Sequence, residues 1–92
     1  MINMELKDTV DMMLSSDYKE RFKAEYYQLK IRYYKLKTMY DNWDNLNFTP
    51  TCTKRTYKAQ LQAMHSYLLI LIARAAVENI DIEGLGDEEN VN

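Results

Sequence analysis

The stretch DYKERFKAEYYQLKIRYYKLKTMYDNWDN, residues 17–45, carries the strongest structural pattern in the chain. It contains neither Gly nor Pro, and large apolar residues recur along it at alternating intervals of four and three positions: Phe22, Tyr26, Leu29, Tyr33, Leu36, Tyr40 and Trp43. This spacing places them on one stripe of an α-helix, as in the seam of a coiled coil. The stretch therefore predicts a long helix over residues 17–45 that packs against another helix.

A second row with the same spacing follows a short break. Residues 44–53, DNLNFTPTCT, are rich in Asn, Asp and Thr and contain the only Pro, which is typical of a loop. Beyond them, apolar residues again recur every four and three positions: Tyr57, Leu61, Met64, Leu68, Leu71 and Ala75. We expect a second helix over about residues 51–80, with Thr49, Thr51 and Thr53 as competing N-caps. Two such helices joined by a short loop form an antiparallel hairpin.

Two shorter segments flank this predicted hairpin, which spans residues 17–82. Within residues 1–16, one apolar stripe predicts a short amphipathic helix: Leu6, Val10, Met13 and Leu14. Residues 83–92 contain the only two glycines and a cluster of acids, which predicts a flexible acidic tail. The predicted fold class is all-α.

The later half of the second helix is apolar on nearly all sides. Six residues surround its stripe: Tyr67, Ile70, Ile72, Ala73, Ala76 and Val77. A helix of this kind is buried on most sides, and one partner helix covers only one of them. We therefore expect the N-terminal helix, a second copy of the chain, or both to cover the rest, and we expect a homo-oligomeric helical bundle.

Composition and charge exclude several classes of function. The formal net charge of -2 argues against general nucleic-acid binding, although seven cations lie between Lys19 and Lys37. Cys52 is the only cysteine, so no internal disulfide forms and a reducing compartment is expected. The most apolar run, residues 67–77, is too short for a membrane span and contains Arg74. With no secretory signal at the N-terminus, a cytoplasmic location is predicted.

The chain has few of the residues that catalysis and metal binding need. His65 is the only histidine, and a nucleophile needs a base beside it. A metal site needs converging ligands, and the acids gather only near the C-terminus without calcium-loop spacing. Glycine motifs for phosphates or dinucleotides are absent. We therefore expect a protein that is not an enzyme and that carries no metal or cofactor.

The segment TPTCTKRT, residues 49–56, has the strongest features of a binding site. Four hydroxyls, the backbone amides of a helix start and the cations Lys54 and Arg55 meet there, and such helix starts attract phosphate oxygens. We expect phosphate contacts from four residues: Thr53, Lys54, Arg55 and Thr56. The alternative is a capped helix start with two solvated cations.

The eight tyrosines and Arg74 also have two interpretations. At heptad spacing, tyrosines are most simply core or interface residues with their hydroxyls at the bundle edge. Alternatively, Tyr26, Tyr33, Tyr34 or Tyr57 stacks on a planar ligand such as a nucleobase. Arg74 is not expected to be buried unpaired, and it either pairs with Glu78 or faces an anionic ligand. The residues predicted to line a pocket are Tyr26, Tyr33, Tyr57 and Arg74.

Two motifs resemble those of a known family. The pattern Y-x-E-R-(M/F)-x-x-E is matched by Tyr18, Glu20, Arg21, Phe22 and Glu25. The pattern Q-L-x-A-M-x-x-Y-x-x-I-L-x-x-R is matched by Gln60, Leu61, Ala63, Met64, Tyr67, Ile70, Leu71 and Arg74. With them, residues 18–82 resemble small helical-hairpin proteins of tailed phages and prophages, typified by a crAss-like phage family. The hairpin is also similar to that of phage sponges, oligomers that sequester the cyclic oligonucleotide or cyclic ADP-ribose signals of CBASS and Thoeris immunity.

The resemblance implies a phage-encoded anti-defence protein in the cytosol of a bacterium. It would bind a cyclic nucleotide signal between subunits without hydrolysing it. The sponges' contact residues do not map onto this sequence, so the site residues named above rest on their chemistry. One alternative is an inhibitor or adaptor that binds a protein, for example a host defence nuclease, through an apolar helix face or the acidic tail. Another is a structural protein whose heptads form an oligomer.

Overall fold

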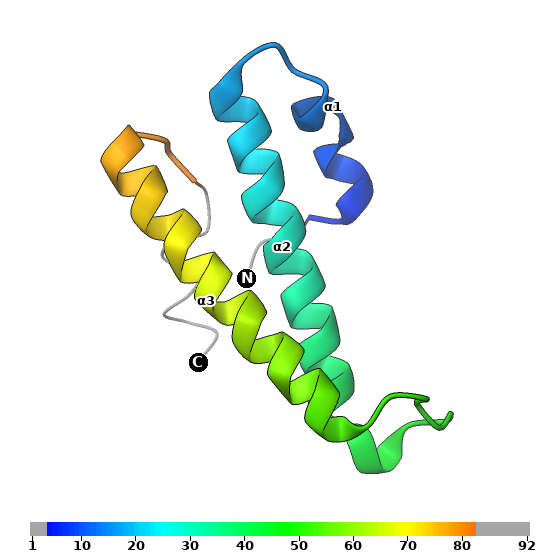
Figure 1. Ribbon diagram of the computed structural model, residues 1–92. Coiled ribbons are helices and arrows are strands. Elements are labelled where there is room, and N and C mark those ends of the chain that lie inside the picture. The colour runs from blue at the N-terminus through cyan, green and yellow to red at the C-terminus, as the bar shows by residue number, and fades with distance from the viewer. Residues whose placement is uncertain (1–3, 83–92) are drawn as a thin grey trace.

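The computed structural model describes residues 4–82, and the predicted acidic tail at residues 83–92 lies outside this range. Its elements are, in order, the 3-10 helix η1 (Leu6–Thr9), α1 (Val10–Met13), α2 (Tyr18–Asp41), the 3-10 helix η2 (Trp43–Asn45) and α3 (Lys54–Glu78). These described residues contain no strand, and α2 and α3 form an antiparallel hairpin (Figure 1). The predicted all-α hairpin with a short N-terminal helical segment is confirmed.

Local hydrogen bonds set where the long helices begin and end. The backbone of Asp17 is extended, and its carboxylate accepts a hydrogen bond from the Lys19 amide at 2.9 Å, so α2 begins at Tyr18. At the same end of the hairpin, Asn79 adopts the left-handed conformation with φ 62° and ends α3. Asn is one of the few residues that tolerate this conformation, which closes the helix at its last turn.

The N-terminal segment packs on α2, on the side away from α3 (Figure 1). Gln28 of α2 reaches across and donates a hydrogen bond from Nε2 to the Thr9 hydroxyl at 2.9 Å. Thr9 is fully buried, and its hydroxyl in turn donates to the Leu6 carbonyl at 2.7 Å. The sequence predicts that the short N-terminal helix, a second copy of the chain, or both cover α3. In the structure, the N-terminal segment packs on α2 instead.

The core lies at the end of the hairpin that is distant from the loop. It combines the first half of α2, the second half of α3 and the segment after α3: Phe22, Tyr26, Tyr27, Leu68, Leu71, Ala75, Ile80 and Ile82. Nearer the loop, the residues of the two predicted rows are only partly buried: Leu36, Tyr40, Tyr57, Leu61 and Met64. Only two helices meet there, so each row keeps one flank open to solvent.

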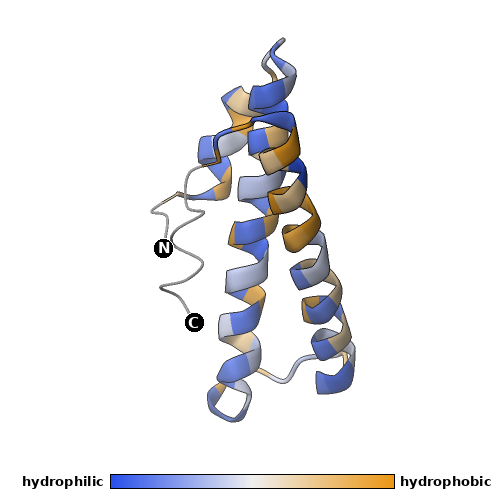
Figure 2. Cartoon of the chain, turned by 90° about the vertical axis from the view of Figure 1, so that its left-hand side faces the viewer, coloured by the Kyte–Doolittle hydropathy of each residue, from blue (hydrophilic) through white to orange (hydrophobic). Residues whose placement is uncertain are grey.

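The second half of α3 carries a run of hydrophobic residues (Figure 2), several of which face solvent. Leu69, Ile70 and Val77 are 53%, 57% and 86% exposed. Isolated exposed apolar residues are ordinary on protein surfaces, but a continuous stripe of them along one helix marks an interaction surface. None of the helices in residues 4–82 is long and apolar enough to cross a membrane.

Replacing Leu71 by Ala should destabilise the fold strongly. Leu71 is fully buried between α2 and α3, and deleting its branched end leaves a cavity that costs about 2–5 kcal/mol. Leu14→Ala is the matched control, because Leu14 is 79% exposed and its loss should cost less than about 0.5 kcal/mol. Urea unfolding followed by circular dichroism measures both, and equal losses would contradict this placement of the core.

Candidate functional site

Aromatic rings and a cation gather where the hairpin turns. The Nζ atom of Lys54, the first residue of α3, lies 5.0 Å from the ring centroid of Tyr40 in the last turn of α2. The rings of Trp43 in η2 and Tyr57 in α3 have centroids 5.9 Å apart. The three rings are partly buried and Lys54 is exposed. We call these four residues the turn-end cluster.

Thr53 and Thr56 fix the start of α3 beside this cluster. Thr53 is the N-cap, and its hydroxyl accepts a hydrogen bond from the Thr56 amide at 3.2 Å. The two hydroxyl oxygens are also hydrogen-bonded to each other at 3.0 Å. Of the three threonines that could have capped the helix, Thr53 does so. The helix start carries positive charge, and the exposed Lys54 and Arg55 add to it.

The structure brings only part of the predicted site together. The segment 53–57 is continuous, whereas Tyr26 is fully buried in the core with its ring edge-on to Tyr27. Tyr33 lies midway along the hairpin, partly buried, with its ring centroid 6.0 Å from that of His65. Arg74 is about 30 Å from Lys54 along the helix axis. Within one chain, the eight predicted residues therefore lie in separate places.

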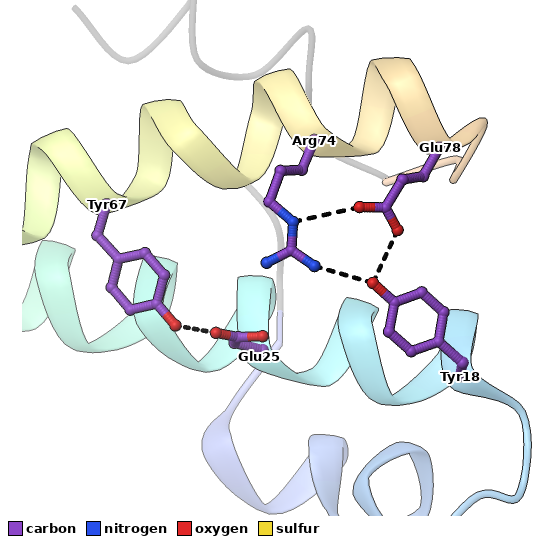
Figure 3. A network of polar contacts seen from close by, with 5 residues as sticks. All are labelled: Tyr18, Glu25, Tyr67, Arg74 and Glu78. Atoms are coloured by element: carbon purple, nitrogen blue, oxygen red, sulfur yellow. Dashed lines mark hydrogen bonds and ion pairs between the residues drawn. The ribbon is translucent and has the colours of Figure 1, made fainter.

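Arg74 closes the open end of the hairpin (Figure 3). Its Nε atom pairs with the Glu78 carboxylate at 3.2 Å, as the sequence predicted. Its Nη2 atom donates a hydrogen bond to the Tyr18 hydroxyl at 2.8 Å, and that hydroxyl donates to Glu78 at 2.7 Å. The guanidinium also lies over the Phe22 ring, 5.0 Å from its centroid. These contacts join the start of α2 to the end of α3.

A second polar contact crosses between the same two helices. The hydroxyl of Tyr67 donates a hydrogen bond to the carboxylate of Glu25 (Figure 3). Tyr18, Glu25, Tyr67 and Arg74 all belong to the two motifs on which the family resemblance rests. These four polar motif residues therefore hold α2 against α3, which is a structural role within the chain.

The contacts of Tyr18 and Glu78 shift their proton equilibria. The hydrogen bond from Tyr18, followed by that from Arg74, lowers the pKa of the Glu78 carboxyl below its ordinary value. The same hydrogen bond to Glu78 raises the pKa of the Tyr18 hydroxyl. A lowered carboxyl pKa stabilises the fold at neutral pH, and this contribution is lost as the pH falls through the folded pKa.

Several cations of α2 serve local structure. Lys19 donates from Nζ to the Asn79 carbonyl at 3.3 Å, and Arg21 donates to the Ser15 carbonyl at 2.8 Å. Lys37 pairs with Asp41 at 2.8 Å, and this hydrogen bond raises the pKa of Lys37. The cations that lie beside partly exposed aromatic rings at a helix start are those of α3, which makes the turn end the best candidate site.

Tyr40 and Trp43 belong to the predicted seam and are not among the predicted site residues. A signal was present, because they are the last two members of the first row and Tyr57 is the first member of the second. A hairpin brings the end of one row beside the start of the other. The contacts of Tyr40 with Lys54 and of Trp43 with Tyr57 follow from that connection.

The fold and the turn-end cluster define a small helical-hairpin protein with a cationic, aromatic end. A family model described as Sequestin matches residues 16–77, and the chain belongs to this family. The match covers α2, the loop and nearly all of α3 and leaves out η1 and α1. No curated protein and no solved structure matches the chain.

Replacing Thr53 by Ala should cost about 1 kcal/mol of stability, because the Thr56 amide loses its capping partner. Thr51→Ala is the matched control, since Thr51 is exposed and lies before the cap, and it should stay within about 0.5 kcal/mol of wild type. Thermal unfolding of both variants provides the measurement. A larger loss for Thr51→Ala than for Thr53→Ala would show that the helix start is assigned wrongly.

Glu78→Gln should make stability less dependent on pH. The carboxylate of Glu78 stabilises the fold at pH 7, and this contribution is lost as the pH falls through the lowered pKa of the folded state, so the wild type should lose more stability than the variant between pH 7 and pH 3. The control Asp11→Asn removes a negative charge from the exposed surface of α1. It should lose as much stability as the wild type between pH 7 and pH 3. Urea titrations at the two pH values measure the free energy of unfolding of each variant. If Glu78→Gln loses as much stability as the wild type, the contact of Glu78 with Tyr18 and Arg74 is refuted.

Proposed function

We propose that this protein binds and sequesters a cyclic nucleotide immune signal without hydrolysing it, as a phage-encoded anti-defence protein in the cytosol of the infected bacterium. Membership of the Sequestin family over residues 16–77 carries the proposal, because the family's name describes sequestration, the task of a binding protein. The resemblance of the hairpin to phage sponges supports the chemical class of the ligand.

The turn-end cluster supports the proposal through its chemistry. Lys54 and Arg55 supply positive charge for phosphate oxygens, and the planar Arg55 guanidinium can donate two parallel hydrogen bonds to one phosphate. Trp43 and Tyr57 supply ring faces for a base, and stacking of this kind contributes about 1–3 kcal/mol per base. Cyclic oligonucleotides and cyclic ADP-ribose both combine phosphates with a base, so both fit this pairing of groups.

The contact between Lys54 and Tyr40 helps to prepare the site. With Nζ 5.0 Å from the ring centroid, the lysine is held by a cation–π interaction at the helix start. Less side-chain freedom is then lost when a phosphate binds. The overall charge of -2 is compatible with an anionic ligand, because a small pocket needs only a few cations. We propose that the protein is a homo-oligomer, so that each assembly offers several such ends.

Replacing Lys54 and Arg55 together by Ala should abolish ligand capture and leave the fold intact. Both side chains are exposed, and cations at a helix start oppose the helix dipole, so their removal does not weaken α3. The measurement is a thermal-shift screen with cyclic di- and trinucleotides and cyclic ADP-ribose isomers. Ligand at 100 times its Kd stabilises by about 2.7 kcal/mol, a rise in Tm of about 10 °C or more for wild type.

The matched control replaces Arg32 and Lys35 by Ala, which removes the same charge from an exposed part of α2. This variant should keep the wild-type shift, because it lies away from the turn end. Loss of the shift in both double variants would show general charge attraction in place of a site. No shift for wild type across the panel would favour a protein partner, and would contradict capture of a cyclic nucleotide.

A further inference from the structure

A second heptad row runs along the outer side of α3. Each of its members lies two positions beyond a member of the inner row that packs on α2, which is about 200° around the helix. The spacing is again four, three, four, three and four: Ala59, Ala63, Ser66, Ile70, Ala73 and Val77. All six residues are exposed, including Ile70 at 57% and Val77 at 86%.

The composition of this outer row suits another helix. None of its members is charged, so covering the row removes no charge from water. Ala59, Ala63, Ser66 and Ala73 are small, which lets a second helix axis approach at the short end of the usual 8–10 Å range. Spacing by four and three is the pattern that a helix, and not a strand or loop, follows over ~27 Å.

We infer that a second copy of this chain covers the outer row with its own α3, packed antiparallel. The two-fold axis crosses the middle of the row, at the level of residue 68 along the helix. With the axis there, the row is complementary to itself. Ala59 then faces Val77 of the second copy, and Ser66 faces Ile70, so each large side chain meets a small one. Ala63 faces Ala73 at the points of closest approach.

The charges of α3 select the antiparallel direction. Lys54, Arg55 and Lys58 lie in its first two turns, and Glu78 and Asp81 lie at and just beyond its end. In an antiparallel pair, the three cations of one copy lie beside the acids of the other and beside its negative helix C-terminus. A parallel pair would place cations beside cations along the same edge, which is repulsive.

Ala63→Glu tests the interface without disturbing the monomer, because Ala63 is exposed in the single chain. Sedimentation equilibrium without any ligand should give wild type a mass twice the 11.0 kDa of the chain. Ala63→Glu buries an unpaired charge on each side and should raise the dimer dissociation constant at least about 100-fold. Gln60→Glu adds the same charge one turn away, outside the row, and should remain dimeric. A monomeric wild type, or a dimer unaffected by Ala63→Glu, would overturn the inference.

Cysteine cross-linking tests the direction. In a Cys52→Ser background, an Ala63→Cys chain should not cross-link to itself, because its two thiols lie about 15 Å apart along the antiparallel pair. The same holds for Ala73→Cys. A mixture of the two variants should form a disulfide-linked dimer under mild oxidation, since position 63 faces position 73. Cross-linking within either single variant would contradict the antiparallel direction. Because no ligand is present in either experiment, failure here is separate from failure of the proposed signal capture.

Discussion

The packing of α2 against α3 is the constraint on which the rest of this molecule depends. Two helices alone bury little surface, and the buried core cluster of this hairpin lies at the end where Phe22, Leu71 and Ala75 pack together with Ile80 and Ile82. Towards the loop, the residues of the two apolar rows are only partly buried. One end of the hairpin therefore supplies stability, and the other presents partly exposed aromatic rings beside cations.

This division explains where the polar residues are used. At the stable end, Tyr18, Arg74 and Glu78 bond to one another across the helices, and Tyr18 and Arg74 are positions of the motifs behind the family resemblance. At the loop end, Lys54 and Arg55 stay in solvent beside the cluster of Tyr40, Trp43 and Tyr57. Tyr18 and Arg74 therefore serve the scaffold, and the proposed ligand site lies at the turn end. The outer row of α3 adds a third surface, which we infer is covered by a second copy.

Spacing alone predicted the two long helices, because apolar residues at alternating intervals of four and three, without Gly or Pro between them, fit an α-helix and few other structures. It predicted their bounds less well, giving residues 17–45 and 51–80 where α2 and α3 span 18–41 and 54–78. The apolar row continues to Trp43, but the backbone tightens into η2 there. Thr49, Thr51 and Thr53 carry the same hydroxyl, so only the path of the loop selects the cap. Tyr26 and Tyr57 both belong to the apolar rows, but Tyr26 lies in the buried core cluster with Ile80 and Ile82, whereas Tyr57 lies near the loop and is only partly buried.

Capture of a signal without chemistry predicts that the bound ligand can be recovered unchanged. The purified protein would be saturated with a cyclic oligonucleotide or cyclic ADP-ribose, separated from free ligand, and denatured. Mass spectrometry of the released material should then show the intact cyclic molecule, in a fixed ratio to protein. Release of a linear or smaller product would contradict sequestration and indicate an enzyme. Recovery of no nucleotide from any member of the panel would contradict the assignment of the ligand class.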